Sequence, residues 1–246
     1  MFRILFVNIF IFTHFAALAQ ITSTENLLKE MHKRYHGKFY KHITFIQLNK
    51  IFQSDSVTEN SVWFEAYEYP GKLRVDFGPT VGKDGYIFIN DSVYYFKDGF
   101  LERKEKKINE SMLLSGDIYC IQIPEVIAKL NTLGYDIKKF REDKWKNKPV
   151  YVIGAELGND TSRQFWIDKE FLYVVRHIIN ENGLIQEIHF SEHQANGKFY
   201  IEDEVKIMEN GKIVKTERYA EVNPNIILPA TVFDPNLWSK IHWKTK

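Results

Sequence analysis

Two pairs of histidines have the type and spacing that metal chemistry would need. His32 and His36 stand four residues apart, which puts both on one face of a helix. His189 and His193 lie in a segment of strand character, where an even spacing also puts both on one face. Each pair could supply two ligands, but no third ligand follows at a fixed spacing, and a zinc site needs at least three from the protein. We therefore expect no metal and no cofactor.

The other reactive side chains have settings that argue against catalysis. Cys120 is the only cysteine, and its apolar neighbours predict a buried small side chain rather than a reactive thiol. The carboxylates of Glu202, Asp203 and Glu204 would alternate between the two faces of a strand, so a solvated charge run is expected. The sequence holds no nucleophile-elbow, phosphate-loop or metalloprotease motif. We expect no enzyme activity.

Two amphipathic helices are predicted around a long β-rich stretch. The first covers residues 25–35 and stops before Gly37. The second covers residues 124–133, with proline in its first turn and Gly134 at its end. Between the β-rich stretch and the second helix, residues 105–117 are polar and weakly patterned, and they are expected to form a loop.

Most of the remaining chain has the period of two that is typical of β-strands. Leu73, Val75 and Phe77 alternate with charged residues, as in a strand with one solvated face. Asn90-Asp91 separates two aromatic-rich runs and predicts a tight hairpin. Turn sequences such as Asn210-Gly211 continue the pattern in the second half of the chain. About eleven strands are expected.

Three runs are apolar on both faces, namely residues 86–89, 93–96 and 171–175. A half-solvated antiparallel strand alternates, so here both faces must be covered or one must line a cavity. A β-sandwich core explains the pattern equally well. With two helices available as a cover, we predict a mainly β fold with two or three helices (α+β): a curved antiparallel half-barrel of about eleven strands whose helices lid a hydrophobic cavity.

The first nineteen residues have the form of a cleavable secretory signal peptide. Arg3 precedes a short apolar run, and Ala17-Leu18-Ala19 forms a small-x-small cleavage site before Gln20. The run is too short for a permanent membrane anchor. Gln20 stands where a lipid-anchored bacterial protein has cysteine, so we expect an exported, soluble, periplasmic protein without a lipid anchor. Residues 20–246 would form its single domain.

The charge balance of the mature chain limits its partners. Cleavage removes one basic residue from the 33 basic and 32 acidic residues, which leaves a formal charge of zero. That balance argues against nucleic acid and against docking on anionic lipid.

Four short motifs follow one another along most of the chain. They are a Trp-containing strand that leads through a Pro turn into an alternating strand, a hairpin with an aromatic second strand, a later strand-turn-strand unit, and a C-terminal Phe-x-Pro element. Their positions are 62–77, 89–96, 165–176 and 232–235. In this order they resemble the LolA-like outer-membrane lipoprotein-sorting proteins, a superfamily of periplasmic lipoprotein carriers.

The resemblance implies an open half-barrel that binds acyl chains of lipoproteins or lipids in its cavity and ferries them between membranes. Its partners would be the acylated cargo, an inner-membrane donor protein and an outer-membrane acceptor protein. The protein would act as a monomer. An envelope module that senses lipid or lipoprotein on the same fold is the alternative.

Carried over by position, the resemblance implies that six residues of the first strands face the cavity: Trp63, Tyr67, Tyr69, Leu73, Val75 and Phe77. In the hairpin we expect Phe88, Val93 and Tyr95 to face it as well, because residues that flank a two-residue turn pair across it. Ile127 and Leu130 of the second helix are predicted to form part of a movable lid. A lipoprotein carrier with the same strand order has an arginine before the proline, where it holds the lid shut. This chain has Tyr69 there, so its lid must be fastened differently.

Overall fold

The computed structural model describes residues 21–196, 199–224 and 226–244, so the predicted signal peptide lies outside the described residues. The strands of the first half are β1 (His42–Gln53), β2 (Ser56–Glu68), β3 (Lys72–Phe77), β4 (Asp84–Ile89), β5 (Ser92–Lys97) and β6 (Phe100–Lys106). Those of the second half are β7 (Phe140–Trp145), β8 (Lys148–Ile153), β9 (Gln164–Asp168), β10 (Val174–Glu181), β11 (Leu184–Ser191), β14 (Glu204–Glu209) and β15 (Lys212–Asn223). A separate two-stranded ribbon joins β12 (Gln194–Asn196) to β13 (Phe199–Ile201).

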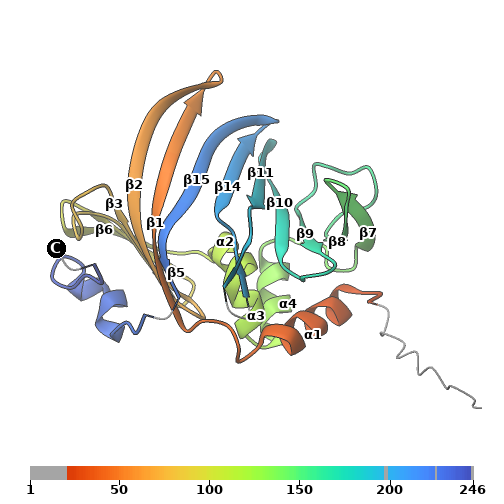
Figure 1. Cartoon of the computed structure of the whole chain (residues 1–246), viewed down its shortest axis with the longest axis horizontal. Helices are drawn as coiled ribbons and strands as arrows, with labels where there is room; N and C mark the ends of the chain where they lie inside the picture. Colours follow the sequence, from red (N-terminus) through yellow and green to blue (C-terminus); the bar gives the residue numbers. More distant parts are fainter. Residues whose placement is uncertain (1–20, 197–198, 225, 245–246) are drawn as a thin grey trace, which may run out of the picture.

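One antiparallel sheet of 13 strands has the order β6-β5-β4-β3-β2-β1-β15-β14-β11-β10-β9-β8-β7. It is strongly curved and stays open, because β6 and β7 at its two edges do not pair with each other (Figure 1). The predicted curved antiparallel half-barrel with helices is therefore confirmed. The sheet has more strands than the roughly eleven expected.

Pairing of β15 with β1 joins the last strand of the sheet to the first. Gln47 lies opposite Tyr219, and Asn49 lies opposite Glu217. Residues 47–60 form the outer part of the β1–β2 hairpin. These residues are largely polar, so the apolar alternation that reveals a strand is missing there, and backbone pairing between the strands decides the structure.

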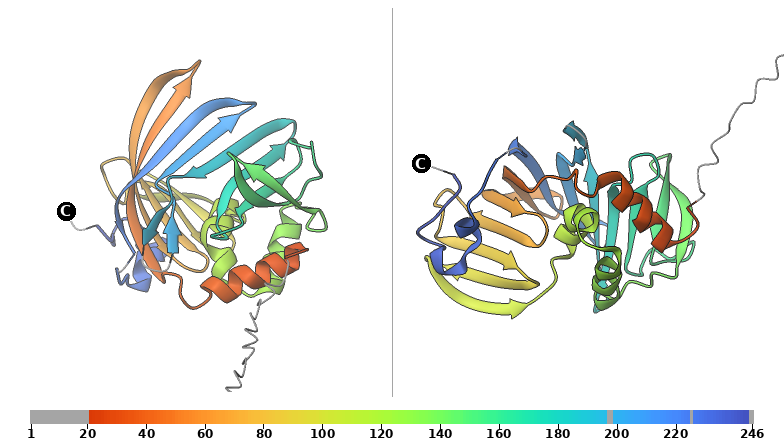
Figure 2. Two further views of the ribbon diagram at one scale, coloured as in Figure 1. Left: turned by 45° about the vertical axis from the view of Figure 1, so that its right-hand side comes forward. Right: turned by 90° about the horizontal axis from the view of Figure 1, so that it is seen from below.

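The helices lie on the concave side of the sheet (Figure 2). Helices α1 (Thr24–Tyr35) and α4 (Ile123–Thr132) confirm the two predicted helices. The predicted loop is partly wrong, because residues 110–120 are helical: α2 (Glu110–Met112), a π-helical turn (Leu113–Asp117) and α3 (Ile118–Cys120). The Asn109 side chain caps this segment by accepting from the Met112 N–H at 3.0 Å.

Two apolar clusters fill the concave side. The larger one packs buried residues of α1, α3 and α4, such as Leu27, Ile118 and Leu130, against the second half of the sheet. The smaller one gathers Leu73 and Phe88 of the first half around Met112 of α2. The helical segment 110–120 thus contributes to both clusters and lies between the two halves of the sheet (Figure 2).

The C-terminal segment packs on the convex face of the first half. It forms two 3₁₀ turns, Ala230–Phe233 and Pro235–Leu237, which include most of the predicted Phe-x-Pro element. Phe233 and Trp238 are almost fully buried there. Among the described helices, none has the length and apolar character to cross a membrane.

Candidate functional site

A hollow opens on the concave side between the sheet and the helical segment. Its walls come from both halves of the sheet, and its volume is about 190 Å³. Aromatic and aliphatic side chains dominate the lining, which comprises Phe39, Tyr40, Ile43, Phe45, Gln47, Trp63, Glu65, Tyr67, Tyr69, Leu73, Tyr86, Asn109, Ser111, Ser115, Ile188, Phe190, Tyr200, Ile201, Glu202, Val205, Ile207, Glu217 and Tyr219.

A second hollow of about 580 Å³ adjoins the first one. The two share Tyr86, Asn109 and Ser111, so their linings are continuous. Phe88 and Tyr95 line the second hollow from the first half of the sheet. Together the two hollows form a groove along the helical segment, and apolar side chains make up most of its combined lining.

Strand alternation explains why these side chains meet. Tyr67 lies opposite Leu73 on β3, and Leu73 lies opposite Phe88 on β4, so all three point to the concave face. The same row continues from Phe88 to Val93 on β5. Side chains one residue along each strand, such as Arg74, point to the convex face instead.

The structure places the predicted cavity residues in three groups. Trp63, Tyr67, Tyr69 and Leu73 line the first hollow, and Phe88 and Tyr95 line the second. Val75, Phe77 and Val93 belong to the apolar cluster that these residues form on the concave face. Ile127 and Leu130 are not in the lining of either hollow: Leu130 is fully buried in the larger core, and Ile127 packs against that core. Ligand binding by these residues stays a prediction.

Sequence reasoning missed the half of the hollow that comes from β1 and the C-terminal strands. Phe45 on β1 and Tyr219 on β15 stack with ring centroids 4.3 Å apart, although they are far apart in the sequence. Alternation places each of them on one face of its own strand, but only the β1–β15 pairing shows that the two faces are the same.

The first hollow also contains three carboxyl groups, those of Glu65, Glu202 and Glu217, among its mainly apolar side chains. Burial and the nearby Glu217 raise the pKa of Glu65 to about 8, and burial raises the pKa of Glu202 to about 7. The sequence predicts Glu202 on a solvated strand face, but the residue lies between β13 and β14, is half-buried and lines the hollow. Lys215 pairs with Glu217 at 2.7 Å and lies 3.8 Å from the centre of the Trp63 ring.

Tyr69 and its neighbours fasten the helical segment to the first half of the sheet. The Tyr69 ring lies against Gly116 so closely that any side chain at Gly116 would overlap it. One residue further, the Asp117 carboxylate accepts a hydrogen bond from the Gly71 N–H at 3.0 Å. Lys129 of α4 forms an ion pair with Asp91 in the β4–β5 turn. These contacts fasten the helical segment and α4 to the first half of the sheet.

The start of the helical segment is fastened to the second half of the sheet. Glu110 accepts hydrogen bonds from the Tyr135 hydroxyl at 2.5 Å and from Nε2 of His177 at 3.0 Å, and it forms an ion pair with Arg163. His177 is fully buried. The helical segment is therefore held at both ends, by polar groups at one end and by an aromatic ring at the other.

The histidines considered as metal ligands pack against neighbouring rings, and Cys120, considered as a reactive thiol, is half-buried. The rings of His32 and His36 stack on each other 4.0 Å apart, and His193 stacks on Tyr173 at 3.8 Å. Within the described ranges, no group of three or more His, Cys, Asp or Glu side chains is arranged to hold a metal ion. Burial and the nearby Asp117 raise the pKa of the Cys120 thiol to about 12, so it is not a thiolate at neutral pH.

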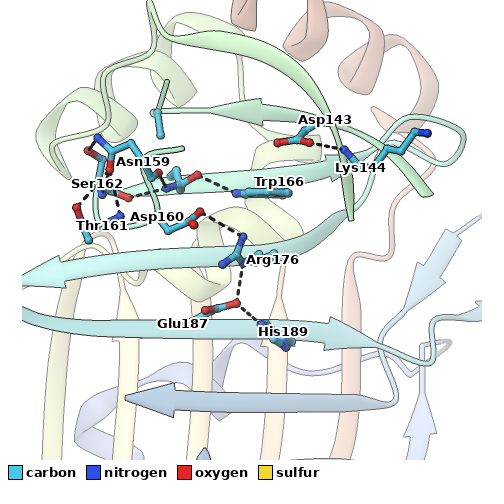
Figure 3. Close-up of polar contacts among 12 residues, drawn as sticks. Asp143, Lys144, Asn159, Asp160, Thr161, Ser162, Trp166, Arg176, Glu187 and His189 are labelled. Carbon is cyan, nitrogen blue, oxygen red and sulfur yellow. Dashed lines mark hydrogen bonds and ion pairs between the residues drawn. The ribbon is translucent and has the colours of Figure 1, made fainter. Parts of the chain in front are cut away.

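A polar cluster on the outer face of β9 to β11 is the other concentration of charge. Figure 3 shows Arg176 donating to Glu187, at 2.6 Å, and Glu187 bonded in turn to His189. The Arg176 guanidinium also lies about equally close to the rings of Trp145 and Trp166, at 4.6 and 4.5 Å. Each of these polar groups therefore has a hydrogen-bond or cation–π partner within the cluster, which indicates a structural role.

Comparison with known proteins rests on structure. No protein-family model matches the sequence, and no curated protein matches it. Three solved structures are similar over most of their length. A DUF1329 family protein from Desulfovibrio piger has a TM-score of 0.59 and 11% identity, and covers 87% of this chain and 97% of its own.

A putative outer membrane lipoprotein-sorting protein domain from Vibrio parahaemolyticus has a TM-score of 0.60 and 12% identity, with 89% and 98% coverage of the two chains. A LolA superfamily protein from Nitrosomonas europaea has a TM-score of 0.56 and 9% identity, with 88% and 99% coverage. At these identities the similarity establishes the fold, which is LolA-like.

Proposed function

With a LolA-like fold as the premise, we propose that this protein is a carrier that binds acyl chains of lipoproteins or lipids and ferries them between membranes. The observation that carries the proposal is the groove formed by the two adjoining hollows, whose apolar walls come from both halves of the sheet. The name of the Vibrio parahaemolyticus structure, a putative lipoprotein-sorting domain, supports the same class of cargo.

The physics of acyl chains explains why a carrier is needed. Each buried methylene is worth about 0.8 kcal/mol, so a chain of about sixteen carbons resists entry into water by roughly 12 kcal/mol. A carrier must offer an apolar surface of similar worth and must also release its cargo. Closure of the helical segment over the empty groove would compete with cargo and so allow release.

The predicted export signal is consistent with this role. We propose that the mature protein works in the periplasm without a lipid anchor, between an inner-membrane donor and an outer-membrane acceptor. Ile127 and Leu130 would act from the core side of α4, where their packing against the larger cluster sets how easily the cover moves.

A charge introduced between the two hollows is expected to prevent acyl binding. Tyr86 lines both hollows and is only partly buried, so the Tyr86→Glu variant should still fold. It should bind a fluorescent sixteen-carbon fatty acid at least about tenfold more weakly, because the bound acyl chain would remove water from the new carboxylate. The matched control is Tyr94→Glu on β5, where the side chain points to the convex face. Equal affinity of wild type and Tyr86→Glu, with both folded by circular dichroism, would place the binding site elsewhere.

Loosening the fastening of the helical segment is expected to favour cargo. Gly116→Ala would push the Tyr69 ring aside and reduce the free energy of unfolding by about 1–3 kcal/mol. Fatty-acid affinity should rise several-fold, because the closed state of the empty protein, which competes with binding, becomes less stable. In a Tyr69→Leu background the alanine has room, so the stability loss should shrink. Equal losses of stability in both backgrounds would show that the ring contact does not hold the segment.

A further inference from the structure

We propose that the first hollow selects acylated molecules whose polar end carries an ammonium group. This inference rests on the proposed carrier function and specifies its cargo. Three features of the hollow favour such a ligand: stacked aromatic rings, three carboxyl groups beside them of which Glu65 is buried, and a lining without positive charge.

The aromatic rings line one wall of the hollow in a continuous series. Phe45 stacks on Tyr219 at 4.3 Å and on Tyr67 at 5.9 Å between ring centroids, and Tyr67 stacks on Tyr69 at 5.3 Å. Burial raises the pKa of these three tyrosines well above its ordinary value, so they are neutral hydroxyls at physiological pH. The faces of such rings attract cations, and the attraction is strongest where water is excluded.

Glu65 sits in the same wall, directly opposite Phe45 on the neighbouring strand β1. It is 4% exposed and lines the hollow together with Glu217 of β15 and Glu202. A buried carboxylate is unfavourable unless a donor or a positive charge faces it. The Tyr67 hydroxyl is a hydrogen-bond partner of Glu65, but it brings no positive charge.

The positive charge is missing from the lining itself. No Lys, Arg or His is among the described residues that line the first hollow. Lys215 lies beside it and acts to lower the pKa of Glu65, but burial and Glu217 outweigh this effect, and the Lys215 ammonium group pairs with Glu217 and lies over the Trp63 ring. A ligand with an anionic end would therefore find no cation in the lining, whereas an ammonium group would meet both carboxyl groups and aromatic faces.

The free protein holds Glu65 largely protonated at pH 7, because its burial and the proximity of Glu217 raise its pKa. An ammonium ligand favours the ionised form of the same carboxyl. The site thus avoids an uncompensated charge when it is empty and gains an ion pair when it is filled.

The test compares three ligands of equal chain length, dodecylamine, dodecanol and dodecanoate, by displacement of a fluorescent fatty acid from the full mature protein. We expect dodecylamine to bind at least about tenfold more tightly than dodecanol, with dodecanoate weakest. Glu65→Gln should remove most of the preference for the amine, so that dodecylamine and dodecanol bind the variant with similar affinity. The control Glu59→Gln makes the same change at an exposed position of the same strand and should have no effect.

The outcomes separate this inference from the carrier function. If dodecanol binds as tightly as dodecylamine, the head-group preference is wrong and acyl binding stands. If none of the three ligands displaces the probe, the proposed function itself fails. Two further pairs identify the source of the ammonium group: a diacyl lipopeptide with a free or acetylated amino terminus, and an ethanolamine or glycerol phospholipid. Discrimination within either pair supports the inference, and discrimination in neither overturns it.

Discussion

Replacement of Arg74 by alanine should lower the free energy of unfolding by about 3–5 kcal/mol, as expected when one partner of a fully buried ion pair is removed. Arg74 and Asp76 are both 0% exposed on the convex face of β3. The guanidinium donates to both Asp76 oxygens, at 2.7 and 3.0 Å. Without it the buried Asp76 carboxylate would keep only the Gly82 N–H, at 2.6 Å, and Nε2 of His242, at 3.0 Å, as partners.

The same guanidinium also holds the C-terminal segment. It donates to the carbonyl oxygens of Val232, Trp238 and Ile241 at 3.2, 2.8 and 2.6 Å, and it lies 4.2 Å from the centre of the Trp238 ring. Its loss leaves three carbonyl groups without their donor as well as a buried charge. The segment should therefore detach before the sheet unfolds.

Urea unfolding measures the loss of stability. Limited trypsin digestion at Lys240 measures the detachment of the C-terminal segment. The control Arg103→Ala removes an arginine from the exposed edge strand β6 and should change stability by less than about 1 kcal/mol. If Arg74→Ala and Arg103→Ala have the same free energy of unfolding and trypsin cuts both at the same rate, then Arg74 does not hold the C-terminal segment on the sheet.

Glu110→Ala should have a comparable effect, about 3–5 kcal/mol, because it removes the carboxylate that binds Arg163, Tyr135 and His177 and leaves Arg163 with only the exposed Glu181. Burial acts to raise the pKa of Glu110, but hydrogen bonds from His177, Arg163 and Tyr135 and the charge of His177 outweigh it and lower the pKa to about 2. The folded-state pKa is thus below the ordinary value. The stabilisation is present above about pH 4.5 and is lost as pH falls toward 2.

Unfolding of wild type between pH 6 and pH 2 measures this dependence, which should amount to about 3 kcal/mol from Glu110. Glu110→Gln should be less stable than wild type at pH 6 and should show a correspondingly flatter pH profile. Glu125→Ala, on the exposed side of α4, serves as the control and should keep the wild-type profile. A wild-type profile in Glu110→Gln would mean that another group carries the acid sensitivity.

The sequence predicts those parts of the fold that local pattern determines. Leu73, Val75 and Phe77 alternate with polar residues, and their strand forms where it is expected. Helix α1 likewise follows from its apolar face and its capping serine, whose hydroxyl accepts from the Asn26 N–H at 3.2 Å. In these elements the local preference and the tertiary structure agree.

Other parts depend on contacts that no local pattern contains. The helical segment 110–120 is polar at its start and has glycine inside its π-helical turn, so its sequence gives a weak helix signal. Its fixed position comes from Glu110 at one end and from Tyr69 packed on Gly116 near the other. The carboxyl groups of the first hollow also come together through long-range contacts, since only the β1–β15 pairing brings Glu65 and Glu217 close to each other.

The most direct test of acyl binding in the groove is photolabelling of the mature protein with a sixteen-carbon fatty acid that carries a diazirine near its end, followed by mass-spectrometric mapping of the labelled peptides. We expect labels on peptides of β2, β4 and β15 that contain Trp63, Tyr86 and Tyr219, and we expect unlabelled fatty acid to compete with the labelling. Labels confined to the convex face or to the exposed edge strand β6, with none in the groove, would contradict it.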